Sequence, residues 1–447
     1  MTNQRYTIQE AHELYKKGEI DLIKWNFEFI ENCKTKEAKI NAWEYLDIAN
    51  WKKKVAETLD DTGLVFDKLL AIPVGVKDIF NTIDMPTSMG SPIWEGFTPG
   101  NDARVVHDIK FNGGVIAGKT ITAEFAVHAP NATRNPWGQD KSPGTSSSGS
   151  AAAVSAGMIP LSLGTQTAGS IIRPASYCGV FGYKPTFGTI PRTGMLKTTD
   201  TLDTVGLFAT NIDDCELLFD VIRVKGLDYP IVNEKLSNVS LQSKLEKKWK
   251  VGVLIDQHPV LKNFNNEVMS DFKKLTLDLT QTNLAEIHYP KIPELLYDAH
   301  RVQQVIYHKS LAYYFKKEFQ NKTLISSVMY DIVSEGNKIT LDEYKEALNT
   351  QNHMTSLLDK FFEEYDVILT PSTANVAPDF NTAIDPPDTC LIWTMCGCPT
   401  INIPVFEKAK LPFGLQVIAR KYCDYKLINF IRDFTYANLF PKFSKIS

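Results

Sequence analysis

A run of small residues from Gly144 to Gly157 constrains the fold of this chain more than any other feature. Serines stand at positions 146, 147, 148 and 150, and three consecutive alanines and a valine follow them. A run rich in serine and glycine could be a flexible linker, but a solvated linker would not continue into alanines and valine. We therefore predict a helix over residues 149–157, with backbone donors and hydroxyl groups gathered at its N-terminus.

A second stretch of small residues follows, and it ends in Ser170, which lies 24 residues after Ser146. Small residues let a substrate approach the backbone closely. Their N–H groups could converge on one point as an oxyanion hole. A phosphate-cradling loop and a plain tight turn are the alternatives. The stretch matches neither G-x-x-x-x-G-K-[ST] nor G-x-G-x-x-G, which argues against nucleotide binding.

An apolar segment, Leu70–Val76, ends at Lys77 and has the pattern of a buried strand. A lysine that is buried at the end of such a strand loses its proton more easily, so its pKa falls. The neutral amine could then act as a general base, and a serine hydroxyl needs such a base to become a nucleophile. In the alternative interpretation, the ammonium group of Lys77 reaches solvent or pairs with Asp78.

Strand-like and helical segments alternate along the chain, which is typical of an α/β architecture. We expect a helix after Thr7, with Glu10 completing a capping box, and another after Asn211. Residues 225–250 are polar, and we expect them to be irregular. The remaining expected strands are 115–119, 251–255, 366–371 and 414–418, and the remaining expected helices are 20–33, 268–279 and 293–314.

The composition is that of an ordinary globular protein, with 447 residues, 43% hydrophobic and 22% charged. The net charge of −4 gives no reason to expect nucleic acid or an anionic membrane as a partner. The N-terminus has no apolar signal segment, and no run is long enough to span a bilayer, so we expect a cytoplasmic protein. The seven cysteines suit a reducing compartment. Cys390, Cys396 and Cys398 cluster, but their spacing does not suit zinc, so no metal is expected.

A Ser-His-Asp triad is the competing catalytic hypothesis. His107, His128 and Asp102 lie in the same half of the chain as the serines. However, no plausible serine stands in a G-x-S-x-G elbow, and these residue types are common in any chain. The residues therefore favour the serine and lysine combination over a histidine triad.

Taken together, these segments resemble the amidase signature family. The matching segments are Gly144–Ser150, Gly164–Pro174, Cys178–Thr186 and Leu202–Gly206, with weaker matches late in the chain at Trp393–Thr394, Gly397–Pro399 and Leu411–Gln416. The resemblance implies an α/β fold in which a twisted mixed β-sheet is covered by helices on both faces. It implies one domain over residues 1–447, with the core signature at about 70–210 and a more variable, substrate-shaping part at about 225–390.

The resemblance also implies roles for individual residues. Lys77 would be the base, Ser146 a relay serine that follows a cis peptide bond, and Ser170 the nucleophile. The assignment of Ser146 rather than its neighbour Ser147 depends on the motif alignment. The oxyanion would be bound by the backbone N–H groups of Thr167, Ala168, Gly169 and Ser170, and no cofactor would be needed.

The chain departs from the family pattern beside the expected nucleophile. Many members have Asp where this chain has Gln166 and Gly where it has Ala168, and the common arginine lies one residue earlier than Arg173. Arg173 could therefore bind a substrate carboxylate with its rigid set of donors, or it could pair with a structural acid. Gln166 and Trp393 are further candidates for substrate contact, with core packing as the alternative for Trp393.

The function that the resemblance implies is hydrolysis of a small-molecule carboxamide through an acyl-enzyme. The first alternative is the A subunit of a glutamine-dependent amidotransferase, which acts on a charged tRNA with partner proteins. The second is a non-catalytic scaffold that keeps the fold. A homodimer is a reasonable expectation, and the sequence does not name the amide.

Overall fold

Strand β2 (Pro73–Lys77) lies between two parallel neighbours, β3 (Val115–Thr120) and β4 (Leu161–Gln166). All of its residues are buried, and the expected strand that ends at Lys77 is thereby confirmed, although it begins at Pro73. The structure is a computed structural model that describes residues 5–61, 68–255, 264–380 and 388–447. Residues 1–4 of the expected signal-free N-terminus lie outside these ranges, as do residues 256–263 and 381–387 of the expected variable part.

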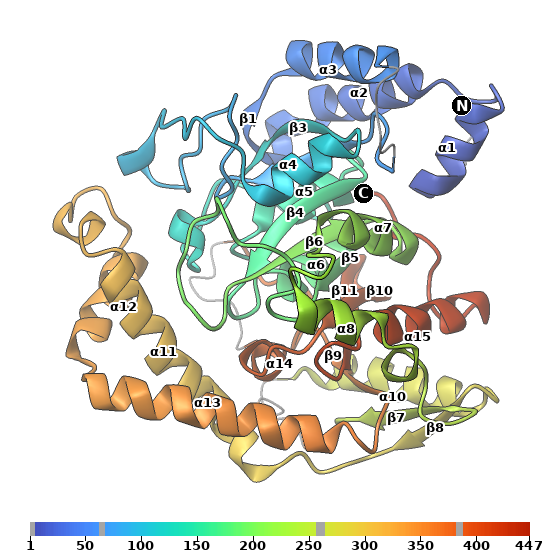
Figure 1. Cartoon of the computed structure of the whole chain (residues 1–447), viewed down its shortest axis with the longest axis vertical. Helices are drawn as coiled ribbons and strands as arrows, with labels where there is room; N and C mark the ends of the chain where they lie inside the picture. Colours follow the sequence, from blue (N-terminus) through green and yellow to red (C-terminus); the bar gives the residue numbers. More distant parts are fainter. Residues whose placement is uncertain (1–4, 62–67, 256–263, 381–387) are drawn as a thin grey trace.

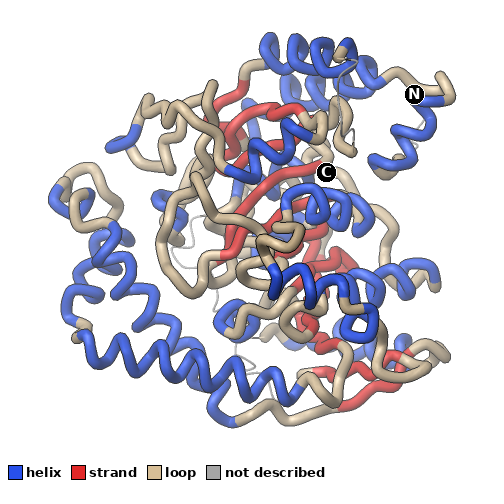
Figure 2. The backbone as a smooth tube through the Cα atoms, in the orientation of Figure 1, coloured by secondary structure: helices blue, strands red, loops and turns tan. Residues whose placement is uncertain are grey.

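The described strands form a single mixed sheet of eleven strands, in the order β1-β3-β2-β4-β6-β5-β10-β11-β9-β7-β8. Parallel pairs occur in two places, around β2 and around β7, and antiparallel pairs join these regions. Figure 2 shows the strands running through the middle of the molecule with helices around them. The other strands are β1 (Trp43–Leu46), β5 (Phe181–Lys184), β6 (Thr204–Ala209), β7 (Trp249–Val253), β8 (Ala285–His288), β9 (Val367–Pro371), β10 (Thr400–Lys408) and β11 (Leu411–Ala419).

Alternate residues of the central strands belong to two separate apolar clusters. In β3, Ile116 packs in one cluster, while Val115 and Ala117 pack in the other. In β6, Leu207 and Phe208 divide in the same way. Successive side chains of a strand point to opposite faces, so the two clusters cover the two faces. The predicted α/β class, with helices on both faces of a mixed sheet, is confirmed.

The helices gather around this sheet, with α2 and α3 at one end of the molecule, α13 toward the other end, and α11 and α12 along one side (Figure 1). The capping box of Thr7 and Glu10 and the cap at Asn211 are both present as predicted. The helices are α1 (Ile8–Lys16), α2 (Leu22–Ile40), α3 (Ile48–Asp60), α4 (Arg104–Phe111), α5 (Ser148–Ser155), α6 (Ile172–Cys178), α7 (Ile212–Ile222), α8 (Pro230–Ser237), α9 (Val239–Gln242), α10 (Asn266–Thr280), α11 (Ala299–Tyr314), α12 (Ser327–Lys338), α13 (Leu341–Phe361), α14 (Leu391–Met395) and α15 (Asp424–Tyr436).

The segment 225–250 is more regular than its composition predicts. It contains α8 and α9, because Leu236 is buried and the side chain of Gln242 donates a hydrogen bond to the carbonyl of Tyr422 at 2.7 Å. Long-range contacts of this kind stabilise short helices that have little intrinsic stability. Across the described ranges, no helix combines the length and apolar character that crossing a membrane requires.

Helix α5 is pressed against the sheet through its serines and Gly149. Ser150 Oγ donates a hydrogen bond to the carbonyl of Leu163 at 2.8 Å. A Cβ atom on Gly149 would lie 2.3 Å from the carbonyl oxygen of Ala42 and 2.5 Å from the backbone nitrogen of Ile121. Only glycine therefore fits where this helix meets the backbone beside β1 and β3.

Gly149→Ala is expected to lower the free energy of unfolding by about 1–3 kcal/mol, because overpacking forces backbone shifts. Urea unfolding followed by circular dichroism measures this change. Ser237→Ala, at an exposed position near the end of α8, serves as the control and should change the value by less than about 0.5 kcal/mol. Equal stability of Gly149→Ala and the unmodified protein would contradict the close approach.

Candidate active site

The side chain of Lys77 is completely buried at the end of β2. Its Nζ lies 2.8 Å from Ser146 Oγ and 2.9 Å from Thr165 Oγ1. Burial lowers the pKa of Lys77 to about 7, while the negative charge of Asp203 acts in the opposite direction. A substantial fraction of Lys77 is therefore neutral near pH 7 and able to accept a proton.

Ser146 and Ser147 have different partners, although they are adjacent. Ser146 contacts the lysine, whereas Ser147 Oγ lies 3.2 Å from the carbonyl oxygen and 3.3 Å from the backbone nitrogen of Thr165. The peptide bond between Thr145 and Ser146 is cis. The geometry thus places Ser146 rather than Ser147 against Lys77.

Ser170 lies in the loop between β4 and α6, and only 8% of it is exposed. Arg173, one turn further on in α6, donates from Nη2 to the carbonyl of Thr145 at 3.0 Å, which ties the Ser170 segment to the Ser146 segment. Lys77 and Ser146 are in direct contact, whereas no hydrogen bond joins Ser170 Oγ to Ser146 in the described structure. Catalytic hydrogen bonds are often long in unliganded enzymes and tighten when substrate binds.

The loop that carries Ser170 contains backbone N–H groups that make no hydrogen bond within the described structure. In the described part of the chain, the N–H groups of residues 167–170 donate to no protein acceptor. The neighbouring carbonyls are occupied, because Ala168 O accepts from Thr394 Oγ1 at 2.8 Å and Gly169 O accepts from the backbone of Arg173 at 3.0 Å. Unpaired, mostly buried N–H groups are what an oxyanion hole requires.

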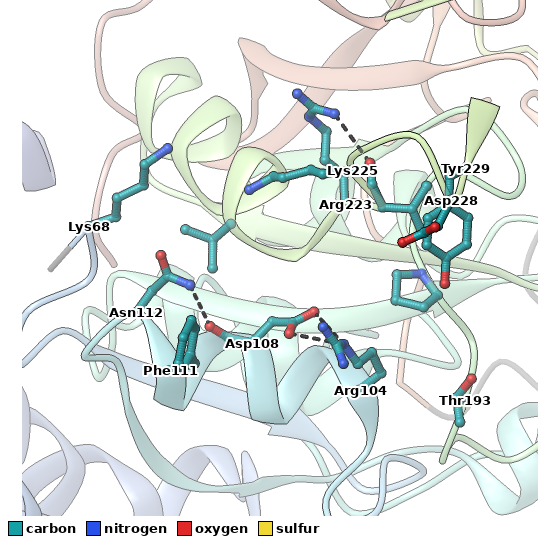
Figure 3. A pocket seen from close by; sticks show the side chains of 13 residues that line it. Lys68, Arg104, Asp108, Phe111, Asn112, Thr193, Arg223, Lys225, Asp228 and Tyr229 are labelled. Carbon is teal, nitrogen blue, oxygen red and sulfur yellow. Dashed lines mark hydrogen bonds and ion pairs between the residues drawn. The ribbon is translucent and has the colours of Figure 1, made fainter. Parts of the chain in front are cut away.

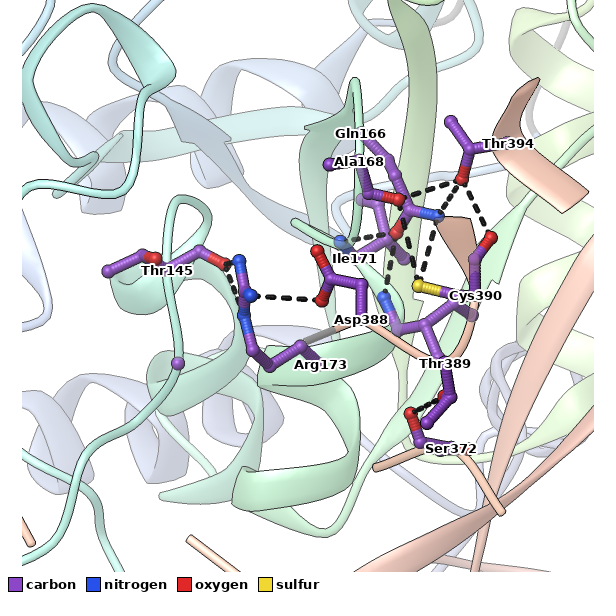
Figure 4. A network of polar contacts seen from close by, with 12 residues as sticks. Thr145, Gln166, Ala168, Ile171, Arg173, Ser372, Asp388, Thr389, Cys390 and Thr394 are labelled. Carbon is purple, nitrogen blue, oxygen red and sulfur yellow. Dashed lines mark hydrogen bonds and ion pairs between the residues drawn. The ribbon is translucent and has the colours of Figure 1, made fainter. Parts of the chain in front are cut away.

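Gln166 is completely buried at the end of β4. Its Oε1 accepts hydrogen bonds from the backbone N–H groups of Ile171 at 2.8 Å and Ile172 at 3.0 Å, and its Nε2 donates to Thr394 Oγ1 at 2.9 Å (Figure 4). The carboxamide group of Gln166 therefore contacts the protein itself and holds the first turn of α6.

Arg173 is ion-paired with Asp388, from Nη1 to Oδ1 at 2.9 Å, and both side chains are nearly buried (Figure 4). Pairing with an acid was one of the two alternatives for Arg173. A Cβ atom on Gly169 would lie 2.0 Å from Asp388 Oδ1, so this carboxylate touches the backbone beside Ser170. Trp393 is fully buried in an apolar cluster, the arrangement that core packing predicts.

Four residues of the site had no role assigned from the sequence. Thr165 is the second partner of Lys77. Asp203 accepts from Thr167 Oγ1 at 2.9 Å and from the backbone of Thr198 at 2.8 Å, which anchors the start of the loop before Ser170. Thr165, Asp203 and Thr394 stand within segments that match the family, so those segments were the available signal. Asp388 lies outside the segments that match the family, so no pattern in the sequence points to it.

A separate open pocket of about 930 Å³ lies between α4 and the segment that follows α7 (Figure 3). Cations from both segments line it, including Arg104 and Lys225. None of Lys77, Ser146 and Ser170 belongs to its lining, so this pocket is separate from the candidate active site.

Comparison with known proteins agrees with this geometry. Residues 27–428 match the family model described as Amidase. The A subunit of the glutamyl-tRNA(Gln) amidotransferase from Clostridium botulinum (strain Alaska E43 / Type E3) is 30% identical, over 95% of this chain and 95% of the relative. The protein of the same name from Alkaliphilus metalliredigens is 31% identical, over 90% of each chain.

Solved structures show the same similarity. The A subunit of the glutamyl-tRNA(Gln) amidotransferase from Thermotoga maritima superimposes with a TM-score of 0.79 at 27% identity, over 95% of this chain and 93% of that one. A structure described as an amidase superimposes with a TM-score of 0.84 at 25% identity, over 95% of this chain and 98% of that one. The family match covers most of the chain, and the protein therefore belongs to the amidase family.

Proposed function

We propose that the protein cleaves the C–N bond of a carboxamide by acyl transfer to Ser170. The contact between the buried Lys77 amine and Ser146 Oγ at 2.8 Å carries this proposal. Neutral Lys77 takes the proton of Ser146, and Ser146 takes that of Ser170. The Ser170 oxygen then attacks the amide carbonyl.

The remaining steps use the same groups in reverse. The oxyanion accepts hydrogen bonds from the unpaired N–H groups of the loop 167–170, and one such donor is typically worth about 3–4 kcal/mol in the transition state. Ser146 returns a proton to the leaving nitrogen, and the C–N bond breaks to leave Ser170 acylated. Water then attacks the ester and releases the carboxylic acid.

The nature of the amide and the fate of the released nitrogen form the second part of the proposal. The relatives over nearly the whole chain are named as A subunits of glutamyl-tRNA(Gln) amidotransferases. Their similarity favours the same kind of role over that of a free-standing hydrolase. We propose that glutamine is the amide donor and that ammonia passes to an acceptor held by partner subunits.

A free-standing hydrolase of small carboxamides is the second candidate. It is favoured by Gln166 and Ala168, which stand where the transferase branch has Asp and Gly. Ammonia release from glutamine, measured beside a panel of aliphatic, aryl and carboxylated amides, separates the two candidates. Co-purification of the tagged chain with partner subunits would support the transferase.

Ser170→Ala is expected to abolish covalent labelling by a fluorophosphonate, because the attacking oxygen is gone. Intact-protein mass spectrometry measures the adduct, and the amide panel measures activity. Labelling that persists in a fully active Ser170→Ala protein would contradict the assignment of the nucleophile.

Lys77→Met is expected to abolish labelling and to lower the free energy of unfolding by no more than about 1–3 kcal/mol, because it leaves two buried hydroxyls without a partner but no buried carboxylate without its cation. Lys119→Met is the matched comparison. Lys119 is also fully buried, but it is ion-paired with Asp78 at 2.9 Å. Its loss leaves a buried carboxylate without its cation and should lower the free energy of unfolding by about 3–5 kcal/mol. A similar loss of stability in Lys77→Met would show that Lys77 has a structural role.

The rate of fluorophosphonate labelling is expected to rise with pH and to level off above about 7, the pKa to which burial lowers Lys77. Below that pH, protonated Lys77 cannot accept a proton, so the rate should fall about tenfold per pH unit. Stopped-flow or quenched labelling between pH 5 and 9 measures the profile. A rate that stays constant down to pH 5 would exclude Lys77 as the base.

Arg173→Ala is expected to lower activity on acidic and neutral amides by a similar factor of roughly 10–100, because its guanidinium positions the backbone at Thr145. The ratio of kcat/KM between carboxylated and neutral amides is the measurement. A selective loss for the carboxylated amides would instead show that Arg173 binds the substrate carboxylate.

A further inference from the structure

We propose that Gln166 and Thr394 are positioning residues for the oxyanion hole, and that they act by fixing the peptide group between Ala168 and Gly169. Gln166 lies at the end of β4, and Thr394 lies in the short helix α14, far along the chain. Both side chains are nearly or completely buried, and neither is one of the three reacting groups. This inference rests on the proposed acyl transfer and names a further part of the same site.

The orientation of the Gln166 carboxamide is determined by its partners. Its oxygen accepts from two backbone N–H groups, those of Ile171 and Ile172. An amide nitrogen could not accept these bonds, so the nitrogen must point the other way, toward Thr394 Oγ1 at 2.9 Å. Gln166 is therefore an obligatory donor to Thr394.

The Thr394 hydroxyl passes this direction on. Because the Thr394 hydroxyl accepts a hydrogen bond from Gln166, its own single proton is left to donate to a carbonyl group. The carbonyl of Ala168 lies at 2.8 Å, and that of Cys390, one turn back in the same helix, lies at 3.1 Å. The shorter contact favours Ala168, whose oxygen also lies 3.6 Å from the Cys390 thiol (Figure 4).

The position of the Ala168 carbonyl determines where the next N–H group points. The peptide group is planar, and in the trans form its C=O and N–H point in opposite directions. The only cis peptide bond in the described ranges is the one before Ser146, so the bond between Ala168 and Gly169 is trans. With the Ala168 carbonyl held toward α14, the Gly169 N–H points away from α14. It has no acceptor within the described structure and is free to bind the oxyanion.

The hydrogen bonds that run from Gln166 through Thr394 to the Ala168 carbonyl give a physical reason for the Gln at position 166, where many family members have Asp. An aspartate at this position could accept hydrogen bonds from the two backbone N–H groups at the start of α6. Its ionised carboxylate, however, has no proton with which to form a hydrogen bond to Thr394. The longer carboxamide of Gln166 does both. Gln166 and Thr394 therefore act together, and the loop that carries the oxyanion donors depends on the side chain of Thr394, which lies far along the chain.

The test uses a fluorophosphonate as the probe, because its phosphoryl oxygen occupies the oxyanion hole when Ser170 attacks, and no knowledge of the natural amide is needed. Thr394→Val removes the hydroxyl at nearly constant volume, Thr394→Ser restores it, and Gln166→Glu removes the donor while keeping the acceptor. Labelling at pH 8 is resolved into the maximal rate constant, kinact, and the half-saturating concentration, KI. An oxyanion bond forms mainly in the transition state, so its loss should act on kinact.

We expect Thr394→Val and Gln166→Glu each to lower kinact by roughly 10–100-fold, with KI changed by less than about threefold. Thr394→Ser should recover most of the rate. The double variant should be no slower than the worse single one, because both changes break the same relay. Thr276→Val is the control: this buried threonine of α10 donates within its own helix, to the carbonyl of Phe272 at 2.9 Å, and its loss should leave kinact unchanged.

Three results would overturn the inference: an unchanged kinact in both variants, a change confined to KI, or a loss that Thr394→Ser does not recover and that parallels a fall in melting temperature. The last result would show a purely structural role. Failure of the proposed function is recognised separately, because the unmodified protein would then not be labelled at Ser170 at all.

Discussion

The removal of one amine from water is the interaction on which the rest of this site depends. A buried ammonium group without a paired carboxylate is unfavourable, and the protein relieves this by lowering the pKa of Lys77 rather than by neutralising its charge with an acid. Asp203 is near enough to influence the pKa, but the direct contacts of the nitrogen are the hydroxyl groups of Ser146 and Thr165. Lys119 shows the opposite solution one strand away, where an equally buried lysine is paired with Asp78.

The order of the strands in the sheet brings the candidate catalytic residues close together. Strands β2 and β4 are parallel neighbours, so the lysine at the end of one and the serine loop after the other emerge at the same edge. Parallel strands commonly place their functional groups at their carboxyl ends. Ser146 lies two residues before helix α5, and α5 contacts β4 through the hydrogen bond from Ser150 Oγ to the carbonyl of Leu163.

Much of this arrangement could be predicted from local patterns. The strand before Lys77, the alanine-rich helix and the capped helices follow from short-range periodicity and cap residues, which depend on neighbours in the chain. The regular structure within residues 225–250 could not be predicted in this way, because α8 and α9 are held by contacts with distant segments such as Tyr422. The same limit applies to Asp388 and Arg173, whose ion pair joins residues far apart in the chain. The partner of a buried arginine is a property of the fold, and nothing in the neighbouring residues indicates it.

Helix α14 and the Arg173–Asp388 ion pair have a consequence for how the protein is made. A chain is synthesised from its N-terminus, and the segments that carry Lys77, Ser146 and Ser170 leave the ribosome well before residues 388–394 exist. Until those residues arrive, the carbonyl of Ala168 lacks Thr394, and Arg173 lacks its acid. The candidate catalytic residues are encoded early, whereas the contacts that order them are encoded late, so an incomplete chain does not yet hold the finished candidate active site.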